Sequence, residues 1–310
     1  MATKDFIEIA DFTAPQLRTL LERALADKKL FGSGKLPATC PRKTLALIFE
    51  KPSLRTRVSF QTAIVHLGGA AIYLTDADIG LGKREPVQDV ARVLGRMCDG
   101  IAARTFSHDS VADLARYSAA PVINALTDYS HPCQAMADVM TAMETFGPNL
   151  AGMKMAFIGD GNNVARSLAA LCARLDMEFV LACPKGYELE AEFVAKLPGM
   201  GGGRYSQTYD ARSAAKGASV LYTDTWVSMG QEQEKAKRVA QFQGFQLNRE
   251  LVALAAKDAV VMHCLPAYRG FEITDEVMED QAATIFAEAE NRLHFQRSLV
   301  NVLIAEGGIQ

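Results

Sequence analysis

From residue 44 onward, short apolar runs alternate with longer amphipathic stretches. Each run is short enough to be a buried strand, and most are followed by sequence of helical or loop character. Strands that alternate with helices in this way build a parallel sheet with helices on its faces. We therefore predict an α/β fold whose strands occupy residues 44–50, 70–76, 100–106, 120–126, 154–161, 178–184, 218–224, 259–266 and 284–289.

The alternation is broken once, at 147–149 (Gly-Pro-Asn), directly after a helical stretch over 134–146. Glycine and proline end regular structure, and a chain of 310 residues exceeds one typical domain. We predict two domains, each a parallel sheet flanked by helices, with the second starting near residue 150. The last segment, from about residue 292, is helical in character and can pack on either domain; the glycine-rich stretch 199–204 is expected to be a loop.

Charge and cysteine usage limit the partners. The chain has 33 Lys and Arg against 36 Asp and Glu, a net charge of -3, so it has no excess of positive charge to neutralise nucleic-acid phosphates. Small ligands are therefore expected. The six cysteines include no CxxC pair, which argues against a zinc site or a disulfide framework and favours a reducing compartment. The first residues show no secretory signal and no membrane span, so a cytoplasmic location is expected.

The first predicted strand leads directly into a cationic segment, SLRTR at 53–57. Ser53 precedes an amphipathic run and is well placed to cap a helix. Arg55 and Arg57 add fixed charges whose fork geometry suits phosphate oxygens. A site for a dianion and a capped helix with solvated arginines are both consistent with this segment taken alone.

Two further strand ends of the first half carry hydrogen-bond donors. Arg104 ends one strand, and the strand over 120–126 runs into a helix that begins at Pro132. His131 is then the expected cap, with Gln134 on the same turn. A neutral imidazole and an amide can both donate hydrogen bonds to a carbonyl-type oxygen. The alternative is a structural helix start with a chance histidine.

The second half opens with GDGNN at 159–163, a segment similar to a dinucleotide-binding loop. Val164 stands where the third glycine of that motif is required, and the strand over 178–184 ends without an acidic residue to bind a ribose. Nicotinamide binding is therefore disfavoured. Asn163, at the start of the next helix, can contact a carboxylate instead, and Asp224, at a strand end, can receive an amine.

Cys264-Leu265-Pro266 ends another strand with a thiol and two backbone carbonyl groups at an expected kink. A lone cysteine is more often a buried packing residue than a functional one, so this segment alone does not identify a site. Trp226 is expected to pack rather than to take part in chemistry.

Five of these segments occur in order along the whole chain: SLRTR, HPCQ, GDGNN, DTWVSMGQE and HCLP. Together they resemble the aspartate/ornithine carbamoyltransferase family, and SMG with HCLP is similar to its ornithine branch. The resemblance implies a carbamoyl phosphate-binding domain over 1–147, joined by a C-terminal helix at about 292–310, and an ornithine-binding domain over 148–291. It also implies a homotrimer with active sites at subunit interfaces, and neither a metal nor an organic cofactor.

The resemblance further implies a role for individual residues. Carbamoyl phosphate would be held by its phosphate at Ser53, Leu54, Arg55 and Thr56, and by its carbamoyl group at Arg104, His131 and Gln134. Ornithine would be held at Asn163, Asp224, Ser228 and Met229, while Cys264 and Leu265 would lie at the reacting centre beside Arg292. The catalytic set would be Arg55, Arg104, His131 and Cys264. Arg57 would brace the phosphate loop, and family members have a cis Leu-Pro bond at HCLP.

Two positions depart from the usual family pattern. Leu54 stands where a threonine is expected, so a backbone N–H remains to bind phosphate but a hydroxyl contact is lost. In many relatives the loop over 77–86 contributes a polar side chain to the neighbouring subunit near the position of Gly80, where glycine offers none. Lys83 or Arg84 is the candidate substitute.

The reaction implied is transfer of the carbamoyl group of carbamoyl phosphate to the side-chain amine of L-ornithine, which gives L-citrulline and phosphate. The alternatives are a transferase acting on another amine, such as putrescine, an N-acylornithine or aspartate, and a catalytically silent binding relative. Aspartate is disfavoured because HCLP replaces the HPLPR-type ending expected for it. A dinucleotide-dependent oxidoreductase is a third alternative.

Overall fold

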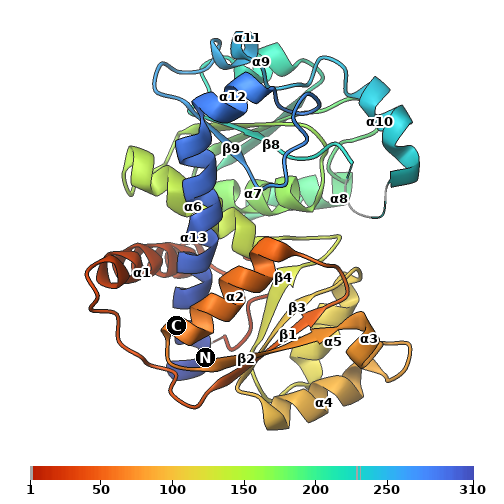
Figure 1. The fold of residues 1–310 in the computed structure, drawn as a ribbon. Helices are drawn as coiled ribbons and strands as arrows, with labels where there is room; N and C mark the ends of the chain where they lie inside the picture. Colours follow the sequence, from red (N-terminus) through yellow and green to blue (C-terminus); the bar gives the residue numbers. More distant parts are fainter. Residues whose placement is uncertain (1–2, 228–229, 231) are drawn as a thin grey trace. The chain divides into compact units, whose positions relative to one another are not determined.

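The computed structural model describes residues 3–227, 230 and 232–310, and the chain forms two compact units (Figure 1). The first unit comprises Met1–Met140 together with Glu290–Gln310, and the second comprises Thr141–Ala289. Each unit contains one parallel sheet flanked by helices. The predicted fold class is therefore confirmed.

The sheet of the first unit has four parallel strands in the order β2-β1-β3-β4. Strands β1, β3 and β4 are buried along all or nearly all of their length and are mostly apolar, as expected for parallel strands covered on both faces. Ala46, Ile48, Ile101 and Ala103 point to one face and pack with Val90. The strands are β1 (Thr44–Phe49), β2 (Ala70–Thr75), β3 (Gly100–Arg104) and β4 (Val122–Leu126).

The helices of the first unit connect these strands and cover the sheet. Their first turns are set by local capping: Thr13 and Gln16 form a reciprocal capping box at α1, and Ser53 caps α2. The elements are η1 (Ile9–Asp11), α1 (Ala14–Gly32), α2 (Leu54–His66), α3 (Asp76–Ile79), α4 (Val87–Met97), α5 (His108–Tyr117) and the first part of α6 (Pro132–Phe146).

The C-terminal segment returns to the first unit, which confirms the prediction that the last helix packs there. It comprises the end of α13 (Ala282–Val300) and a π-helical turn, η4 (Asn301–Ala305). Lys28 donates to the Asn291 side chain at 2.8 Å, and Arg297 donates to the Asp27 carbonyl at 3.0 Å. Figure 1 shows this end of α13 beside α1 and α2.

The sheet of the second unit has five parallel strands in the order β7-β6-β5-β8-β9. Strands β5, β6, β8 and β9 are again buried along all or nearly all of their length. The strands are β5 (Lys154–Ile158), β6 (Glu178–Ala182), β7 (Arg204–Thr208), β8 (Val220–Thr223) and β9 (Val260–His263). The helical elements are α7 (Asn163–Arg174), α8 (Ala191–Val194), η2 (Leu197–Gly199), α9 (Ala211–Ala215), η3 (Glu232–Glu234), α10 (Lys235–Gln241), α11 (Arg249–Val252) and α12 (Asp275–Asp280).

Two sequence-based assignments in the second unit are wrong. The predicted strand over 284–289 lies inside the 19-residue helix α13, because its alanines and glutamates continue a helical pattern that extends well beyond the short apolar window. Strand β7 was not predicted. It lies at one edge of the sheet, and its sequence RYSQT has no fully buried position, so it lacks the apolar run by which the other strands were recognised.

Along the described part of the chain, no helix is both long and apolar enough to cross a lipid bilayer.

Candidate active site

Both sheets have a point where the strand order reverses. In the first unit the chain moves from β1 outward to β2 and then back to β3 on the other side, and in the second it moves from β5 to β6 and β7 and then back to β8. In open parallel sheets, ligands bind beyond the carboxyl ends of the strands at such a switch point. The residues that follow β1 and β3, and those that follow β5 and β8, are therefore the first candidates.

In the first unit, several polar side chains meet at the hydroxyl of Thr56, which is fully buried in the first turn of α2. Ser53, the N-cap of the helix, donates to Thr56 Oγ1 at 3.0 Å. Arg292 Nη2, from α13, lies 2.5 Å from the same oxygen, and Arg104 Nη1, from the end of β3, lies 3.4 Å from it. Strand β3 and helix α13 thus each place one guanidinium group at the N-terminus of α2.

This N-terminus is electropositive. The first N–H groups of a helix point along its axis and carry the positive end of the helix dipole, and Arg104 and Arg292 add full charges that are almost completely buried. The combination suits an anion with several oxygens, because guanidinium groups bind phosphate and carboxylate with paired hydrogen bonds. The helix start predicted at Ser53 is confirmed.

His131 lies at the start of α6 and is almost completely buried. Burial lowers its pKa well below the usual 6.5, and the positive charges of Arg292 and Arg104 lower it further. The imidazole is therefore neutral at physiological pH. The guanidinium groups that contact Thr56 thus also lower the pKa of His131. Gln134, on the following turn, donates to Asp138 Oδ1 at 2.7 Å.

Leu54, Arg55 and Arg57 have different environments. Leu54 is 75% exposed, so its side chain has no part in the buried cluster and only its backbone N–H is available there. Arg55 is half-buried. The Arg57 guanidinium lies 3.8 Å from the ring centre of Tyr73 and donates to Gln61 at 3.3 Å.

In the second unit, the switch point is occupied by a carboxylate that accepts several hydrogen bonds. Asp224 follows β8 and is 6% exposed. Its Oδ2 accepts from Asn162 Nδ2 at 2.7 Å, and its Oδ1 accepts from the backbone N–H of Thr225 at 2.7 Å and from Cys264 Sγ at 2.9 Å. The side chain is thereby fixed in one orientation at the mouth of the sheet.

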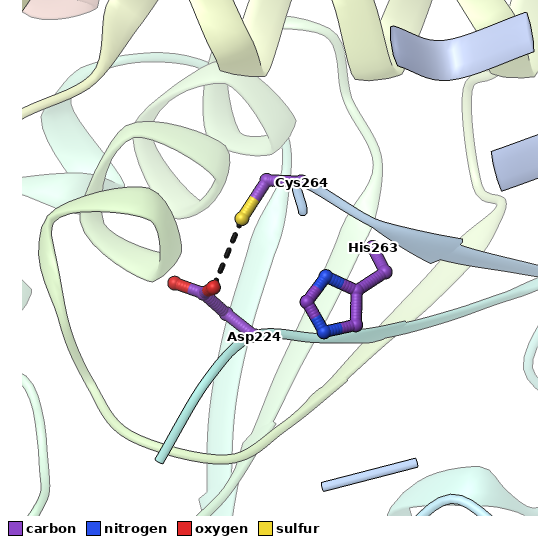
Figure 2. Close-up of side chains that lie close together, drawn as sticks. All are labelled: Asp224, His263 and Cys264. Carbon is purple, nitrogen blue, oxygen red and sulfur yellow. Dashed lines mark hydrogen bonds between the residues drawn. The ribbon is translucent and has the colours of Figure 1, made fainter. Parts of the chain in front are cut away.

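Figure 2 shows that the Cys264 thiol, which follows β9, points at the Asp224 carboxylate, with the His263 imidazole beside them. The thiol is the donor in this hydrogen bond. Leu265 has a backbone φ of 57°, which is uncommon for a residue with a β-carbon, and its N–H donates to His263 Nδ1 at 2.9 Å. The bond between Leu265 and Pro266 is cis, as predicted from the family.

Asp224, His263 and Cys264 bring ligand-type atoms within 4.8 Å of one another, but their hydrogen bonds do not suit a metal ion. His263 Nδ1 accepts from Leu265, and its Nε2 lies 3.1 Å from Glu272 Oε1. Both ring nitrogens are therefore engaged, and the thiol keeps its proton to donate to Asp224. The group is better described as a network that orients Asp224 and Cys264.

The glycine-rich loop after β5 is shaped by packing. A β-carbon on Gly161 would lie 2.7 Å from the carbonyl oxygen of Tyr187 and 2.7 Å from the carbonyl carbon of Glu188, and the Gly161 N–H donates to Tyr187 at 2.8 Å. The loop after β6 thus fills the space beside Gly161. This close contact between two backbones explains a glycine at position 161.

Asn162 was not among the predicted site residues. Its side-chain oxygen accepts from the N–H groups of Val164 and Ala165 and so caps α7, while its amide donates to Asp224. Asn163 is the first residue of the helix. The two asparagines are adjacent in the sequence. The capping residue lies just before the first helical residue, and this rule could have identified Asn162 rather than Asn163 as the cap. Ser228 and Met229, both predicted to bind ornithine, lie outside the described residues.

Gly80, the second departure from the family pattern, ends α3 in the left-handed conformation with φ 57°. Lys83 lies 3.3 Å from Asp76, and Arg84 donates to the carbonyl of Asp78 at 3.4 Å. Both candidate substitutes thus contact residues of their own loop.

Two family models match the chain in succession. The model described as the aspartate/ornithine carbamoyltransferase carbamoyl-P binding domain matches residues 4–144, and the model described as the Asp/Orn binding domain of the same family matches residues 151–303.

Individual proteins with the same family name resemble the chain over nearly its whole length. An ornithine carbamoyltransferase from Methanosarcina mazei is 50% identical over 96% of this chain and 98% of its own length. The structure of an ornithine carbamoyltransferase from Pyrococcus furiosus has a TM-score of 0.93 and 44% identity, covering 99% of this chain and 98% of the other. An anabolic ornithine carbamoyltransferase from Campylobacter jejuni has a TM-score of 0.90 and 40% identity, covering 97% and 99%.

Proposed function

The chain belongs to the aspartate/ornithine carbamoyltransferase family, and from this we propose how its residues divide the chemistry between them. It is an enzyme that transfers the carbamoyl group of carbamoyl phosphate to the side-chain amine of L-ornithine, which gives L-citrulline and phosphate. This reaction belongs to arginine metabolism. The alternatives of a different amine acceptor or of a silent relative are not favoured, because the relatives described above are ornithine carbamoyltransferases.

The first unit is proposed to bind carbamoyl phosphate. The observation that carries the assignment is the convergence of Ser53, Arg104 and Arg292 on the buried hydroxyl of Thr56. Phosphate oxygens would take the N–H groups of Leu54 and of the rest of the first turn of α2, together with the side chains of Ser53, Arg55 and Thr56.

The carbamoyl oxygen is proposed to accept hydrogen bonds from Arg104 and His131, and the carbamoyl amine to donate to Gln134. Negative charge develops on that oxygen when the amine attacks, and donors already in place stabilise it. A neutral His131 can donate one hydrogen bond and is not repelled by the neighbouring arginines, which is consistent with its lowered pKa. Arg55 and the start of α2 take up the charge that gathers on the leaving phosphate.

The second unit is proposed to bind ornithine. Asn163 is placed at the α-carboxylate and Asp224 at the α-amine, with Ser228 and Met229 contributing alongside them. Asp224 is not placed at the reacting amine, because a carboxylate there would favour the ammonium form. Cys264, which donates to Asp224, and Leu265, which follows it in the chain, are assigned to the reacting end of ornithine. The Cys264–Asp224 hydrogen bond supports this placement, since it fixes both side chains relative to each other.

The attacking amine must be neutral. With a lysine-like pKa of about 10.4, removing its proton at pH 7 costs roughly 4 to 5 kcal/mol. Exclusion of water around the bound substrate reduces this cost, because it disfavours the charged form. In the transfer itself, the amine nitrogen bonds to the carbamoyl carbon, the bond from that carbon to the phosphate oxygen breaks, and the departing phosphate takes the proton.

The direct test is an assay for citrulline with carbamoyl phosphate and ornithine. Three other acceptors each change one feature of ornithine. Putrescine lacks the α-carboxylate, N-acetylornithine has a blocked α-amine, and aspartate has a different side chain. We expect turnover with ornithine and little with the others. Faster turnover with putrescine would contradict the placement of Asn163 at a carboxylate.

We also propose that the enzyme is a homotrimer, which the family resemblance implies. Exposed apolar side chains support a protein interface on the first unit. Leu54, Val58 and Val65 are 75%, 51% and 59% exposed and share one face of α2, and Ile72 on the edge strand β2 is 47% exposed. Monomeric proteins seldom expose apolar patches of this kind without a partner.

Sedimentation velocity tests the assembly. The wild-type chain should sediment as a trimer, and the double variant Val58→Glu, Val65→Glu as a smaller species, because buried glutamates would lose their hydration. Tyr209→Glu, at an exposed aromatic residue of the second unit, is the control and should remain trimeric. A double variant that still sediments as a trimer would remove this face from consideration.

A cytoplasmic location is proposed as well. None of the six cysteines forms a disulfide, and four of them are buried, which fits a reducing compartment.

A further inference from the structure

A buried lysine in the first unit contacts residues from the ends of three neighbouring strands. Lys51 lies two residues beyond the end of β1 and is 4% exposed. Lysine is seldom buried unless its charge is paired, because the burial of an isolated ammonium group is costly. Lys51 forms an ion pair with Asp128, two residues beyond the end of β4, and its ammonium group lies 4.3 Å from the ring centre of Phe106, two residues beyond the end of β3. The three residues therefore occupy the same relative position on adjacent strands.

Hydrogen bonds join the same three strand ends. Glu50 donates through its N–H to the carbonyl of Arg104 at 2.9 Å, and its side-chain Oε2 accepts from the N–H of Phe106 at 2.8 Å. The N–H of Asp128 donates to the carbonyl of Phe106 at 3.0 Å. These bonds connect β1 to β3 and β3 to β4. The ion pair between Lys51 and Asp128 adds a connection from β1 to β4, past the strand that lies between them.

The β1 end of this connection leads directly into the proposed phosphate site. A single residue, Pro52, separates Lys51 from Ser53, the N-cap of α2. The proline ring fixes the backbone φ at that step, so the segment has little freedom to bend. A displacement of Lys51 is therefore expected to move the start of α2.

The β4 end leads directly into His131, which is assigned to the carbamoyl group. The turn over 127–130 is closed by two hydrogen bonds: the Thr127 N–H donates to the Ser130 carbonyl at 2.9 Å, and the Ser130 N–H donates to Thr127 Oγ1 at 3.1 Å. Asp128 belongs to this turn, and His131 is the next residue after it. A displacement of Asp128 is therefore transmitted to His131.

We propose that Lys51 and Asp128 are positioning residues, which hold the phosphate-binding start of α2 and the carbamoyl-binding His131 at the spacing that one substrate molecule requires. The inference rests on the proposed binding of carbamoyl phosphate to the first unit. A single bridging oxygen joins the phosphate and carbamoyl groups of this ligand, so both groups bind together only if the two loops keep their spacing. Neither positioning residue is assigned a contact with the substrate.

Charge-removing variants test the pair. Lys51→Met keeps the apolar stem, and Asp128→Asn keeps the size of an exposed side chain, so it tests the proposal even if Lys51→Met proves unstable. Each should raise KM for carbamoyl phosphate roughly tenfold, since a displacement of about 1 Å at a binding site costs up to about a hundredfold. KM for ornithine should stay within about twofold. The double variant should be little worse than either single one, because both changes break the same ion pair. Asp128→Glu keeps the charge and should restore most of the affinity.

A second ion pair of the same sheet is the matched control. Lys43 Nζ lies 2.8 Å from Asp99 Oδ1, and this pair joins the amino ends of β1 and β3, opposite to the proposed site. Lys43→Met and Asp99→Asn remove the same charges and should leave KM for carbamoyl phosphate within about twofold, even where they lower the thermal midpoint. Equal increases in KM from both pairs would show a general loosening of the sheet and would overturn the positioning role.

Calorimetric titration with carbamoyl phosphate, in the absence of ornithine, separates this inference from the proposed function because it needs no turnover. The wild-type protein should bind, and the dissociation constant should rise roughly tenfold in Lys51→Met and in Asp128→Asn. Equal binding by the wild type and both variants would overturn the inference and leave the proposed function standing, whereas a wild-type protein that does not bind would overturn both. Weaker binding by Lys51→Met with unchanged binding by Asp128→Asn would mean that Lys51 itself contacts the phosphate, and would also overturn the inference.

Discussion

Replacing Thr56 with valine removes one buried hydroxyl and keeps the shape of the side chain. That hydroxyl lies 2.5 Å from Arg292 Nη2 and 3.4 Å from Arg104 Nη1. The longer contact is near the limit of a hydrogen bond and contributes little. The shorter one joins a charged donor to a neutral acceptor, an interaction worth about 1.5–3 kcal/mol. Thr56→Val therefore removes the hydrogen bond from Arg292 together with the phosphate contact proposed for the hydroxyl itself.

If this hydrogen bond holds Arg292 in place for the reaction, its loss reduces kcat/KM for carbamoyl phosphate by roughly 10- to 150-fold, since each 1.36 kcal/mol is a factor of ten. The assay measures citrulline at saturating ornithine and varied carbamoyl phosphate. Thr56→Ser keeps the hydroxyl and is the matched control, which should retain most of the activity. Circular dichroism and a thermal midpoint for both variants separate a local effect from misfolding. A folded Thr56→Val variant within about twofold of wild type would refute the role given to this hydroxyl.

Three further perturbations test other parts of the site. Arg104→Ala should lower turnover about a hundredfold or more because it removes a donor to the developing oxyanion, whereas Arg204→Ala, at an exposed arginine, should change it little; equal activities would contradict the assignment. His131 has a lowered folded pKa, so the unfolded chain binds more protons and stability should fall as the pH drops below about 6.5, by at most about 1.4 kcal/mol per pH unit. His131→Gln should flatten that slope in urea titrations at about pH 7.5 and about pH 6; an unchanged slope would count against a buried neutral imidazole. Cys264→Ser keeps a donor to Asp224 and should retain a KM for ornithine close to wild type, while Cys264→Ala should raise it; a larger defect in the serine variant would argue against an orienting role.

Most of the strands that the sequence revealed are buried along nearly their whole length, and β2, at a sheet edge, was recognised by its apolar residues although none of them is fully buried. The run TLALIF of β1 is apolar after its first residue because helices cover both sides of the sheet. β7 lies at the sheet edge, where RYSQT needs no such run, and so it gave no signal. The opposite error occurred at 284–289, where a short apolar window concealed a helix of 19 residues. The missing apolar run hid β7, and at 284–289 the length of the helical pattern was the signal that the short apolar window obscured.

Local chemistry predicted parts of the site, and tertiary contacts supplied the rest. Ser53 was recognisable as a helix cap from its immediate neighbours. The hydrogen bond between Thr56 and Arg292 joins residues 236 positions apart, and no pattern within either segment indicates it. The same holds for Asn162, whose link to Asp224 depends on two strands being adjacent in the sheet.

The return of the chain to the first unit limits how this enzyme can be divided for study. A gene fragment that stops after α6 would encode every strand of the first sheet but neither Arg292 nor the Asn291 partner of Lys28. Such a fragment would leave Thr56 without its strongest donor. A minimal version of the first unit has to join residue 140 to residue 290 by a designed connection. Such a polypeptide keeps both the hydrogen bond from Arg292 to Thr56 and the one from Lys28 to Asn291.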